Sequence, residues 1–355
     1  MRKPRLTAAL AASLAALISF ASQAAPKEHF SVCWTIYAGW MPWEYGTTQG
    51  IVDKWAKKYG IDIDVVQLND YVESINQYTA GQFDGCTMTN MDALTIPAAG
   101  GVDSTALIVG DFSNGNDGIV IKGENKTLAD LKGTPVNLVE LSVSHYLLAR
   151  GLERANLSEK DLKVVNTSDA DLVGAFASDE VKAVATWNPL LAEVVATPKV
   201  SKVFDSSEIP GEIIDLMVVN SETLEDNPAL GKALTGAWYE IMATMAADTP
   251  AGKAAREHMA KASGTDLAGF EAQLAATKMF YSAKDAVEFT SSGRLRETMG
   301  KVAEFSFAHG LLGEGAPSAD AVGMRFAGGV VRGDEGNVKL RFEPRYMQMA
   351  ADGKL

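Results

Sequence analysis

Strand and helix patterns alternate near the amino end of the chain, and this alternation restricts the fold more than any other sequence feature. Residues 30–34 and 61–66 alternate apolar and polar side chains as strands do, and helical spacing follows each of them, at residues 46–60 and 71–81. Residues 82–90 then supply a short strand that ends in a polar loop. Two strand–helix units in succession favour a parallel sheet with helices on its faces. The sequence therefore predicts an α/β fold.

The first 25 residues have the three parts of a secretory signal peptide. A basic start at residues 1–5 precedes an apolar run at residues 6–20, and small residues follow before Lys27. The apolar run is shorter than the roughly 20 residues that a membrane-spanning helix needs. We therefore expect residues 1–25 to be removed and the mature protein to be soluble in the periplasm.

The length of the mature chain predicts two lobes. About 330 residues remain after the signal peptide, more than the roughly 100 to 200 of one ordinary domain. Lobe 1 is expected to combine the first strand–helix units with the largely helical carboxyl-terminal part, residues 26–118 and 216–355. Lobe 2 is expected at residues 119–215. Strands near residues 118–121 and 213–219 would cross between the lobes and act as hinges for closure.

The charge balance and the two cysteines restrict partners and chemistry. A formal net charge of −13 makes nucleic acid and anionic membranes poor partners. Cys33 and Cys86 both fall in expected strands, and an oxidising compartment would permit one disulfide between them. Because bridge geometry is demanding, we expect two buried thiols instead.

Sequence signatures of enzymes and of metal sites are missing from the chain. It has no nucleophile elbow, phosphate-binding glycine loop, zinc-protease helix motif or dinucleotide fingerprint. Its four histidines, at positions 29, 145, 258 and 309, are scattered without the spacing of a metal site. We therefore expect a binding protein without catalytic residues, metal or cofactor, and a partly exposed helix position for His145.

Aromatic, acidic and amide side chains gather instead at the expected strand ends. Half of the chain's six tryptophans lie in residues 30–45. Taken singly, each acid is more often a cap or turn residue and each Trp a core residue. As a set, they form the predicted ligand site, which comprises Trp34, Trp40, Trp43, Glu44, Asp84, Thr87, Asn90, Asp117, Glu140, Ser142, Trp187, Asn188 and Asp215.

The composition of these loops indicates the charge of the ligand. The loops carry no Arg or Lys, and aromatic faces with carboxylates suit a small cation. We expect Trp40, Trp43 and Trp187 to stack on the ligand. Paired hydrogen bonds would come from two acids of the set Glu44, Asp84, Glu140 and Asp215, because burying more would raise their pKa values and leave some protonated. The orienting groups would be Thr87, Asn90, Ser142 and Asn188.

Four segments of the chain carry a family resemblance. They are GWMPWEY at residues 39–45, QFDGCTMTN at 82–90, LADLKGTPVNLVELSVSHYLL at 128–148 and AVATWNPLL at 183–191. In this order they resemble the periplasmic solute-binding proteins of ABC importers in the nitrate/sulfonate/taurine group. The resemblance implies a type II-like fold of two α/β lobes with two hinge strands. It also implies a monomer that delivers its ligand to a membrane permease.

Within this group, the chain looks like the urea-carboxylase-associated subgroup, which implies guanidine or a urea-like ligand. Glu140 stands before Ser142 where the oxyanion-binding members have a small residue. The branch that makes the thiamin pyrimidine has a Cys-rich motif, which this chain lacks. Guanidine is thus the expected ligand. Urea, a sulfonate such as taurine, or a thiamin-precursor pyrimidine remain alternatives, as does a secreted hydrolase of a small amide or amidine.

Overall fold

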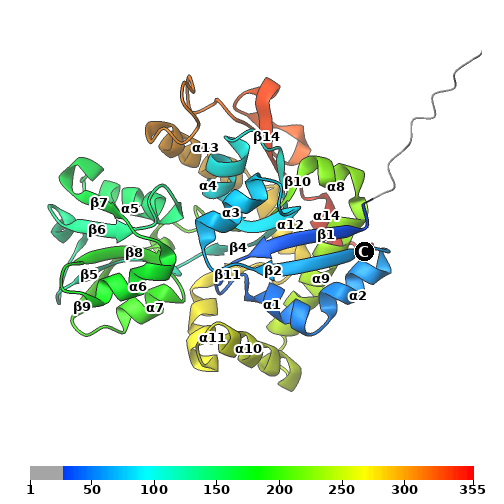
Figure 1. Ribbon diagram of the computed structural model, residues 1–355, viewed down its shortest axis with the longest axis horizontal. Helices are drawn as coiled ribbons and strands as arrows, with labels where there is room; N and C mark the ends of the chain where they lie inside the picture. The colour runs from blue at the N-terminus through cyan, green and yellow to red at the C-terminus, as the bar shows by residue number, and fades with distance from the viewer. Residues whose placement is uncertain (1–26) are drawn as a thin grey trace, which may run out of the picture.

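The computed structural model describes residues 27–355 as an α/β protein with two separate sheets, one in each lobe (Figure 1). The expected signal peptide lies outside the described residues. Among the residues described, no helix combines the length and the apolar character needed to cross a membrane. The strand–helix alternation of the sequence thus folds as an α/β structure.

The first lobe begins with strand–helix units that continue to the first crossing. Its elements are β1 (His29–Trp34), α1 (Met41–Thr48), α2 (Ile51–Lys58), β2 (Asp62–Gln67), α3 (Tyr71–Thr79), β3 (Gly85–Thr89), α4 (Asn90–Ala93), η1 (Leu94–Ala98) and β4 (Ser104–Ser113). β1 pairs in parallel with both β2 and β3, so the predicted parallel sheet is confirmed for these strands.

The second lobe is a smaller α/β unit. Its elements are β5 (Asp117–Lys122), η2 (Leu128–Leu131), β6 (Pro135–Leu138), α5 (Val143–Arg154), η3 (Glu159–Asp161), β7 (Lys163–Asn166), α6 (Asp169–Ala177), β8 (Ala183–Trp187), α7 (Leu190–Val195), β9 (Val200–Asp205) and η4 (Ser206–Glu208). The five strands have the order β7-β6-β8-β5-β9.

The chain then returns to the first lobe and is mostly helical. These elements are β10 (Ile214–Asn220), α8 (Ser221–Asp226), α9 (Pro228–Ala246), α10 (Pro250–Ala262), α11 (Leu267–Ala275), β11 (Thr277–Met279), α12 (Ala283–Thr290), α13 (Gly293–Ala308), β12 (Gly323–Arg325), η5 (Ala327–Gly329), β13 (Val331–Arg332), η6 (Glu335–Asn337), β14 (Val338–Phe342) and α14 (Arg345–Ala351).

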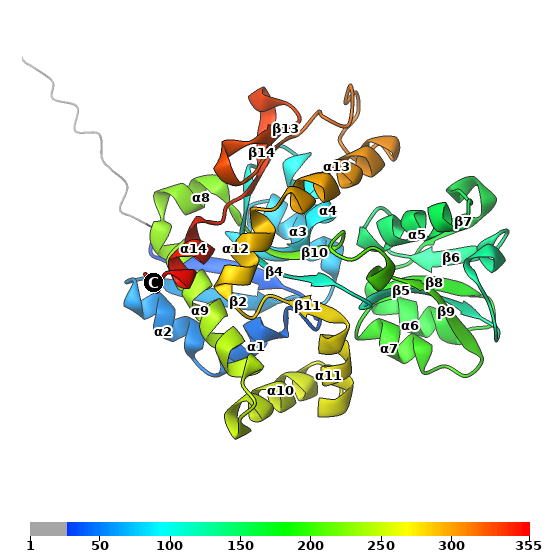
Figure 2. The ribbon, with the colours of Figure 1, turned by 180° about the vertical axis from the view of Figure 1, so that it is seen from behind.

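Helices cover both faces of the larger sheet. Its strand order is β13-β12-β14-β4-β10-β3-β1-β2, and β11 pairs with β4. Helices α3 and α4 lie in front of it in Figure 1, and α9, α12 and α14 lie in front in the reverse view of Figure 2. Residues 106–109 of β4 are therefore buried on both sides, as their continuous apolar sequence requires.

The helix predicted at residues 46–60 is two helices, and the first starts earlier than expected. α1 begins at Met41 with Pro42 in its first turn, a position that suits proline because the missing N–H has no helical partner there. The chain breaks at Gly50, which adopts φ +68°, before α2 begins. Trp43 and Glu44 consequently lie in a helix, and the prediction that they lie in an exposed loop is wrong.

The two crossings between the lobes are short. β4 of the larger sheet is followed at once by β5 of the smaller sheet, so residues 114–116 make the first crossing, and residues 206–213 make the second. The strands predicted to cross, near residues 118–121 and 213–219, each lie within one sheet, so the crossings precede these strands. Asp117 pairs with Trp187 in the smaller sheet, and Asp215 pairs with Thr89 in the larger one.

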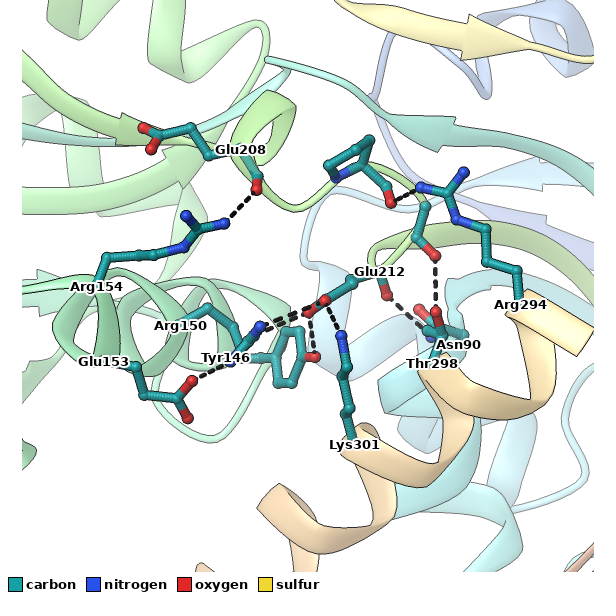
Figure 3. A network of polar contacts seen from close by, with 12 residues as sticks. Asn90, Tyr146, Arg150, Glu153, Arg154, Glu208, Glu212, Arg294, Thr298 and Lys301 are labelled. Atoms are coloured by element: carbon teal, nitrogen blue, oxygen red, sulfur yellow. Dashed lines mark hydrogen bonds and ion pairs between the residues drawn. The ribbon is translucent and has the colours of Figure 1, made fainter.

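Glu212 ties the second crossing to both lobes (Figure 3). Its Oε2 accepts hydrogen bonds from the Tyr146 hydroxyl at 2.7 Å and from Nε of Arg150 at 2.9 Å, both on α5 of the second lobe. Its Oε1 accepts from Nζ of Lys301 at 2.6 Å, on α13 of the first lobe. Its backbone carbonyl accepts from Nδ2 of Asn90 at 3.2 Å. One buried carboxylate therefore joins the crossing segment to helices of both lobes, and the Thr298 hydroxyl adds a further contact by donating to the Gly211 carbonyl at 3.0 Å.

Cys33 and Cys86 form a disulfide, so the prediction of two thiols is wrong. The two residues are direct partners on the adjacent parallel strands β1 and β3, with Cα atoms 4.4 Å apart. This pairing supplies the bridge geometry that the sequence alone could not reveal.

Candidate ligand-binding site

A small cavity lies where the two lobes meet. Its walls come from the carboxyl ends of β1, β3 and β8 and from the ends of β5, α5 and β10 that face them. The space open to the centre of a water molecule is about 20 Å³, little more than one water needs. The lining residues are Tyr37, Trp40, Tyr71, Thr89, Asp117, Val143, Trp187, Ile213 and Asp215.

Four aromatic rings form a connected set around the cavity. Trp40 stacks on Tyr71 with ring centroids 5.8 Å apart, and Tyr37 meets Trp40 edge-on at 5.1 Å. Trp187, from the second lobe, meets Tyr71 edge-on at 5.5 Å. All four residues are buried. These contacts join rings of both lobes into one connected aromatic wall of the cavity.

Two buried acids complete the lining, and a third lies behind them. Asp215, on β10, and Asp117, at the start of β5, face the cavity from opposite lobes. Asp111, on β4, is the register partner of Asp215, and the Tyr37 hydroxyl donates to its Oδ1 at 3.3 Å. A side chain at position 39 would press on this pair, because a Cβ on Gly39 would lie 2.4 Å from Oδ2 of Asp111.

The three acids resist ionisation in the closed protein. Burial raises the pKa of Asp117 to about 7 and that of Asp111 to about 7. Burial, followed by the charges of Asp111 and Asp117, raises the pKa of Asp215 well above its ordinary value. In the part of the chain that the structure describes, the cavity lining contains no Lys, Arg or His. The cavity therefore has acids without an internal counter-ion, and these acids favour their neutral forms until a cation is bound.

Amide side chains hold the first crossing against this cavity. Nδ2 of Asn188 donates to Oδ1 of Asn116, and Nδ2 of Asn116 lies 3.4 Å from the Tyr37 hydroxyl. The backbone N–H of Asn188 donates to the Asn116 carbonyl at 2.9 Å. Tyr37 is thus oriented toward Asp111 through a chain of contacts that begins in the second lobe.

Residues 53–252, more than half of the chain, match the protein family described as NMT1/THI5 like. The chain belongs to the NMT1/THI5-like family. The family resemblance read from the sequence is therefore confirmed at this level. A relative from Brucella abortus (strain 2308), named as a binding protein, is 28% identical over 138 residues. This alignment covers 39% of the chain and 42% of the relative's length.

Solved structures show the fold of this NMT1/THI5-like protein. The alkanesulfonate-binding protein from Xanthomonas axonopodis pv. citri bound to MOPS superposes with a TM-score of 0.67 at 17% identity, covering 84% of this chain and 99% of that one. The aliphatic sulphonate binding protein from Escherichia coli has a TM-score of 0.66 at 18% identity, covering 82% and 95%. The predicted two-lobed periplasmic binding protein fold is confirmed.

Four predicted site residues of the NMT1/THI5-like chain meet in the cavity. They are Trp40, Asp117, Trp187 and Asp215. Ser142 lies at its edge as the N-cap of α5, where its hydroxyl accepts from the Ser144 N–H. Asn188 supports the first crossing as described.

The remaining predicted amide and hydroxyl groups lie deeper in the first lobe. Oδ1 of Asn90 accepts from the Ile214 N–H at 3.0 Å, so this residue fixes the start of β10 rather than lining the cavity. Thr87 is buried within β3, opposite Met217.

Five predicted site residues lie away from the cavity. Trp34 is a core residue at the end of β1, and Trp43 packs on Trp238 with ring centroids 5.2 Å apart. Glu44 pairs with His258 at 2.9 Å. Asp84 lies before β3, at the opposite end of that strand from the cavity, and accepts from Nζ of Lys27 at 2.6 Å. Glu140 is exposed to solvent. The structure therefore does not bring these five together with the other four.

Several lining residues were missed in the sequence. Tyr37 belongs to the aromatic stretch at residues 30–45, so its type and position were available as a signal. Tyr71 and Thr89 look like the start of a helix and the end of a strand. Asp111 looks like a turn residue, yet β4 continues through it to Ser113. Its place opposite Asp215 depends on strand register, which no local pattern reports.

A second group of polar residues joins the lobes at the surface. His145 is buried rather than partly exposed as predicted, and its Nε2 lies 3.2 Å from Oε2 of Glu159. Nε2 of His309 lies 2.7 Å from Oε1 of the same carboxylate. The ligand atoms of these three residues lie within 4.8 Å of one another, as a metal site would require.

The hydrogen bonds of this group indicate that the histidine nitrogens facing Glu159 carry protons and do not bind a metal ion. The Leu141 N–H donates to Nδ1 of His145 at 3.1 Å, so the neutral ring carries its proton on Nε2, the atom that a metal would need. Nδ1 of His309 faces the Phe305 carbonyl at 2.8 Å while Nε2 faces Glu159. Both ring nitrogens of His309 therefore face acceptors, which suits an imidazolium ion paired with Glu159.

Proposed function

We propose that this chain is the periplasmic solute-binding component of an ABC importer, and that it captures a small planar cation, guanidinium first, between its lobes. It would hand the ligand to a membrane permease without transforming it. The family membership and the two-lobed fold support a binding role. The cavity between the lobes supports the choice of ligand.

The observation that carries the proposal is the combination, at one cavity, of aromatic rings and buried acids that have no cationic partner. Oδ2 of Asp215 and Oδ2 of Asp111 are buried, and apart from the contact between these two carboxyl groups they have no hydrogen-bond partner among the described residues. Leaving buried carboxylates without a partner costs several kcal/mol if they are ionised, by order of magnitude. A bound cation would supply both the missing charge and the missing donors. The four rings would add cation–π attraction.

Size and shape favour guanidinium among small cations. Its planar group can lie between the rings and donate in-plane to carboxylates on either side, as an arginine fork does. Asp117 and Asp215 offer these acceptors from opposite lobes, so one ligand would link the lobes. The cavity has room for little more than one water molecule, so it would have to widen to admit guanidinium, and its size restricts the ligand to a few heavy atoms.

A sulfonate is the second candidate, because two structures that are similar in fold bind sulfonates by name. An anion would need Arg, Lys or several free N–H donors. The cavity instead presents two acids, and an anion beside them would raise the electrostatic cost. A hydrolase of a small amidine or amide, the rival from another class, would use the same two acids as acid and base.

Isothermal titration calorimetry tests the proposal. The protein is first unfolded, dialysed and refolded to remove bound ligand. Guanidinium should bind, and urea, which has a similar planar shape but no charge, should bind at least about 100-fold more weakly if an ion pair of about 3 kcal/mol is lost. Methylguanidinium and tetramethylammonium test planarity and size, and taurine and nitrate test the sign of the charge.

Preference for taurine or nitrate over guanidinium would contradict the proposal. Preference for tetramethylammonium would support a cation site but contradict guanidinium as its ligand. Release of ammonia or urea during incubation with guanidinium would replace the binding role with the hydrolase.

A further inference from the structure

Asp92 is a fully buried acid that lies directly behind the cavity wall. Its Oδ2 accepts the Tyr71 hydroxyl hydrogen at 2.6 Å and the Thr89 hydroxyl hydrogen at 2.8 Å. The Tyr71 oxygen in turn accepts from the Thr89 N–H at 3.0 Å. Tyr71 and Thr89 both line the cavity, whereas Asp92 itself does not. The carboxylate thus fixes the orientation of two lining side chains.

The other oxygen of Asp92 is unpaired. Oδ1 is buried and has no hydrogen-bond partner among the described residues. Burial raises the pKa of Asp92 to about 6, and the hydrogen bonds from Tyr71 and Thr89 and the backbone N–H of Val143 limit this rise. Val143 is the first residue of α5 and lines the cavity. The carboxylate of one lobe is therefore close to the amino end of a helix in the other.

The first turn of α5 is a place where a negative charge is favoured. α5 has 12 residues, and none in its first turn is acidic. The free N–H groups and the aligned peptide dipoles of such a helix end attract an anion. Asp92 supplies that anion from within the chain, across the boundary between the lobes.

We infer that Asp92 is a positioning and specificity-determining residue: it occupies the anion position at the amino end of α5 and thereby reserves the adjacent cavity for a cation. This inference rests on the proposed cation-binding function. In the closed form, the Asp92 carboxylate links α5 to Tyr71 and Thr89, and its charge acts on the cavity together with the charges that Asp117 and Asp215 acquire when a cation is bound. An anionic ligand would meet both an occupied helix end and three acids.

The charge of Asp92 also acts on Asp117, which lines the cavity. The Asp92 charge contributes to the raised pKa of Asp117, after the larger effect of burial and against a hydrogen bond from Ser113. A cation bound at Asp117 would therefore be attracted by Asp92 as well, although the two need not be in contact.

Three variants test the role of this carboxylate. Asp92→Asn keeps the shape and removes the charge, and it should weaken guanidinium binding by roughly 10- to 100-fold, the range expected for a unit charge that acts without contact over roughly 6 to 12 Å at an effective dielectric constant of about 20. Asp92→Ala removes the carboxylate and leaves space for formate beside the donors of Tyr71, Thr89 and Val143. Formate should then raise the melting temperature of Asp92→Ala and restore its guanidinium affinity. Asp84→Asn, which removes a buried carboxylate at the far end of β3, is the matched control.

The outcomes separate this inference from the proposed function. Equal guanidinium affinity in the wild type and in folded Asp92→Asn would overturn the role of Asp92. Formate that stabilises Asp92→Ala but neither the wild type nor Asp84→Asn would support the anion position, whichever cation the wild type binds. Formate without effect on folded Asp92→Ala would overturn it. Failure of the wild type to bind guanidinium would overturn only the proposed ligand.

Discussion

Asp111 and Asp215 lie opposite each other on the adjacent antiparallel strands β4 and β10, both buried. Their carboxyl groups are close enough for a proton to be shared between them: the hydrogen bond with Asp215 lowers the pKa of Asp111, whereas Asp111 raises the pKa of Asp215. Like-charged groups in such contact are stable only if one is protonated or a cation is bound. Protonation of this pair and occupation of the cavity are therefore alternatives.

Asp215→Asn should strongly weaken cation binding, because it removes the cavity-facing charge while keeping the shape. The expected loss is roughly 2 to 5 kcal/mol, as for truncating a buried charged partner. Calorimetric titration with guanidinium measures it. Glu140→Gln, which changes a solvent-exposed acid outside the cavity, is the control and should bind as the wild type does. A larger loss in Glu140→Gln than in Asp215→Asn would contradict the placement of the site.

Guanidinium affinity should rise with pH between about 5 and 8, because binding displaces protons from the cavity acids. Asp111 and Asp117 have pKa values raised to about 7 in the unoccupied closed protein, and a bound cation would lower them. Each proton released changes the affinity by up to about tenfold per pH unit below these pKa values. Titration calorimetry in two buffers of different ionisation enthalpy counts the protons. Affinity independent of pH across this range would contradict the coupling.

The same raised pKa values also determine how the stability of the ligand-free protein changes with pH. A group whose folded pKa exceeds its unfolded pKa stabilises the fold below the unfolded value, and this contribution is lost as the pH rises through the folded value. For Asp111 and Asp117 the loss runs from about pH 4 to about pH 7. The melting temperature of ligand-free protein should fall across this window, and added guanidinium should oppose the fall.

Local patterns in the sequence were sufficient for the fold class but not for the full site. Trp40, Asp117, Trp187 and Asp215 were found because aromatic and acidic residues at strand ends stand out locally. Asp111 could not be found this way, because its meeting with Asp215 depends on pairing between strands about 100 residues apart. The disulfide between Cys33 and Cys86 was missed for the same reason.

The residues that were wrongly assigned to the site were misplaced for another reason, which is an error in where a helix or strand begins. Trp43 and Glu44 were placed in a loop because Pro42 was taken to break regular structure, whereas it begins α1. Helical geometry then turns Trp43 toward Trp238 in the core. Asp84 precedes β3 and therefore lies at the wrong end of that strand.

Trp187→Ala should weaken guanidinium binding by roughly 0.5 to 2 kcal/mol through lost cation–π attraction, with a further loss from reduced burial. The residue closes the cavity from the second lobe and contacts Tyr71. Trp43→Phe provides the control, since Trp43 is buried in the first-lobe core away from the cavity. It should lower the melting temperature without changing the affinity. Unchanged affinity in Trp187→Ala would exclude this ring from the site.

Glu212→Gln should destabilise the folded protein by roughly 1 to 3 kcal/mol, because it leaves Arg150 or Lys301 without a charged partner. The side chain of Lys301 is 51% exposed and that of Arg150 is 20% exposed. The loss of stability should therefore be smaller than for a fully buried ion pair. Burial alone would raise the pKa of Glu212, but hydrogen bonds from Arg150, Lys301 and Tyr146 outweigh it and hold the pKa below its ordinary value. This stabilisation is therefore present above the unfolded pKa and is lost as the pH falls.

Thermal unfolding of Glu212→Gln and wild type between about pH 3 and pH 7 measures both effects, and the difference in stability should shrink toward acid pH. Glu153→Gln is the matched control. Glu153 also pairs with Arg150, but its side chain is 62% exposed, so the change should be about 0.5 kcal/mol or less.

Solution scattering on the same proteins tests the hinge. Because Glu212 joins the second crossing to α5 and α13, its loss should increase the radius of gyration of the ligand-free form. A Glu212→Gln protein with wild-type stability and compactness would show that the crossing is held by the backbone contacts of Asn90 and Thr298 instead.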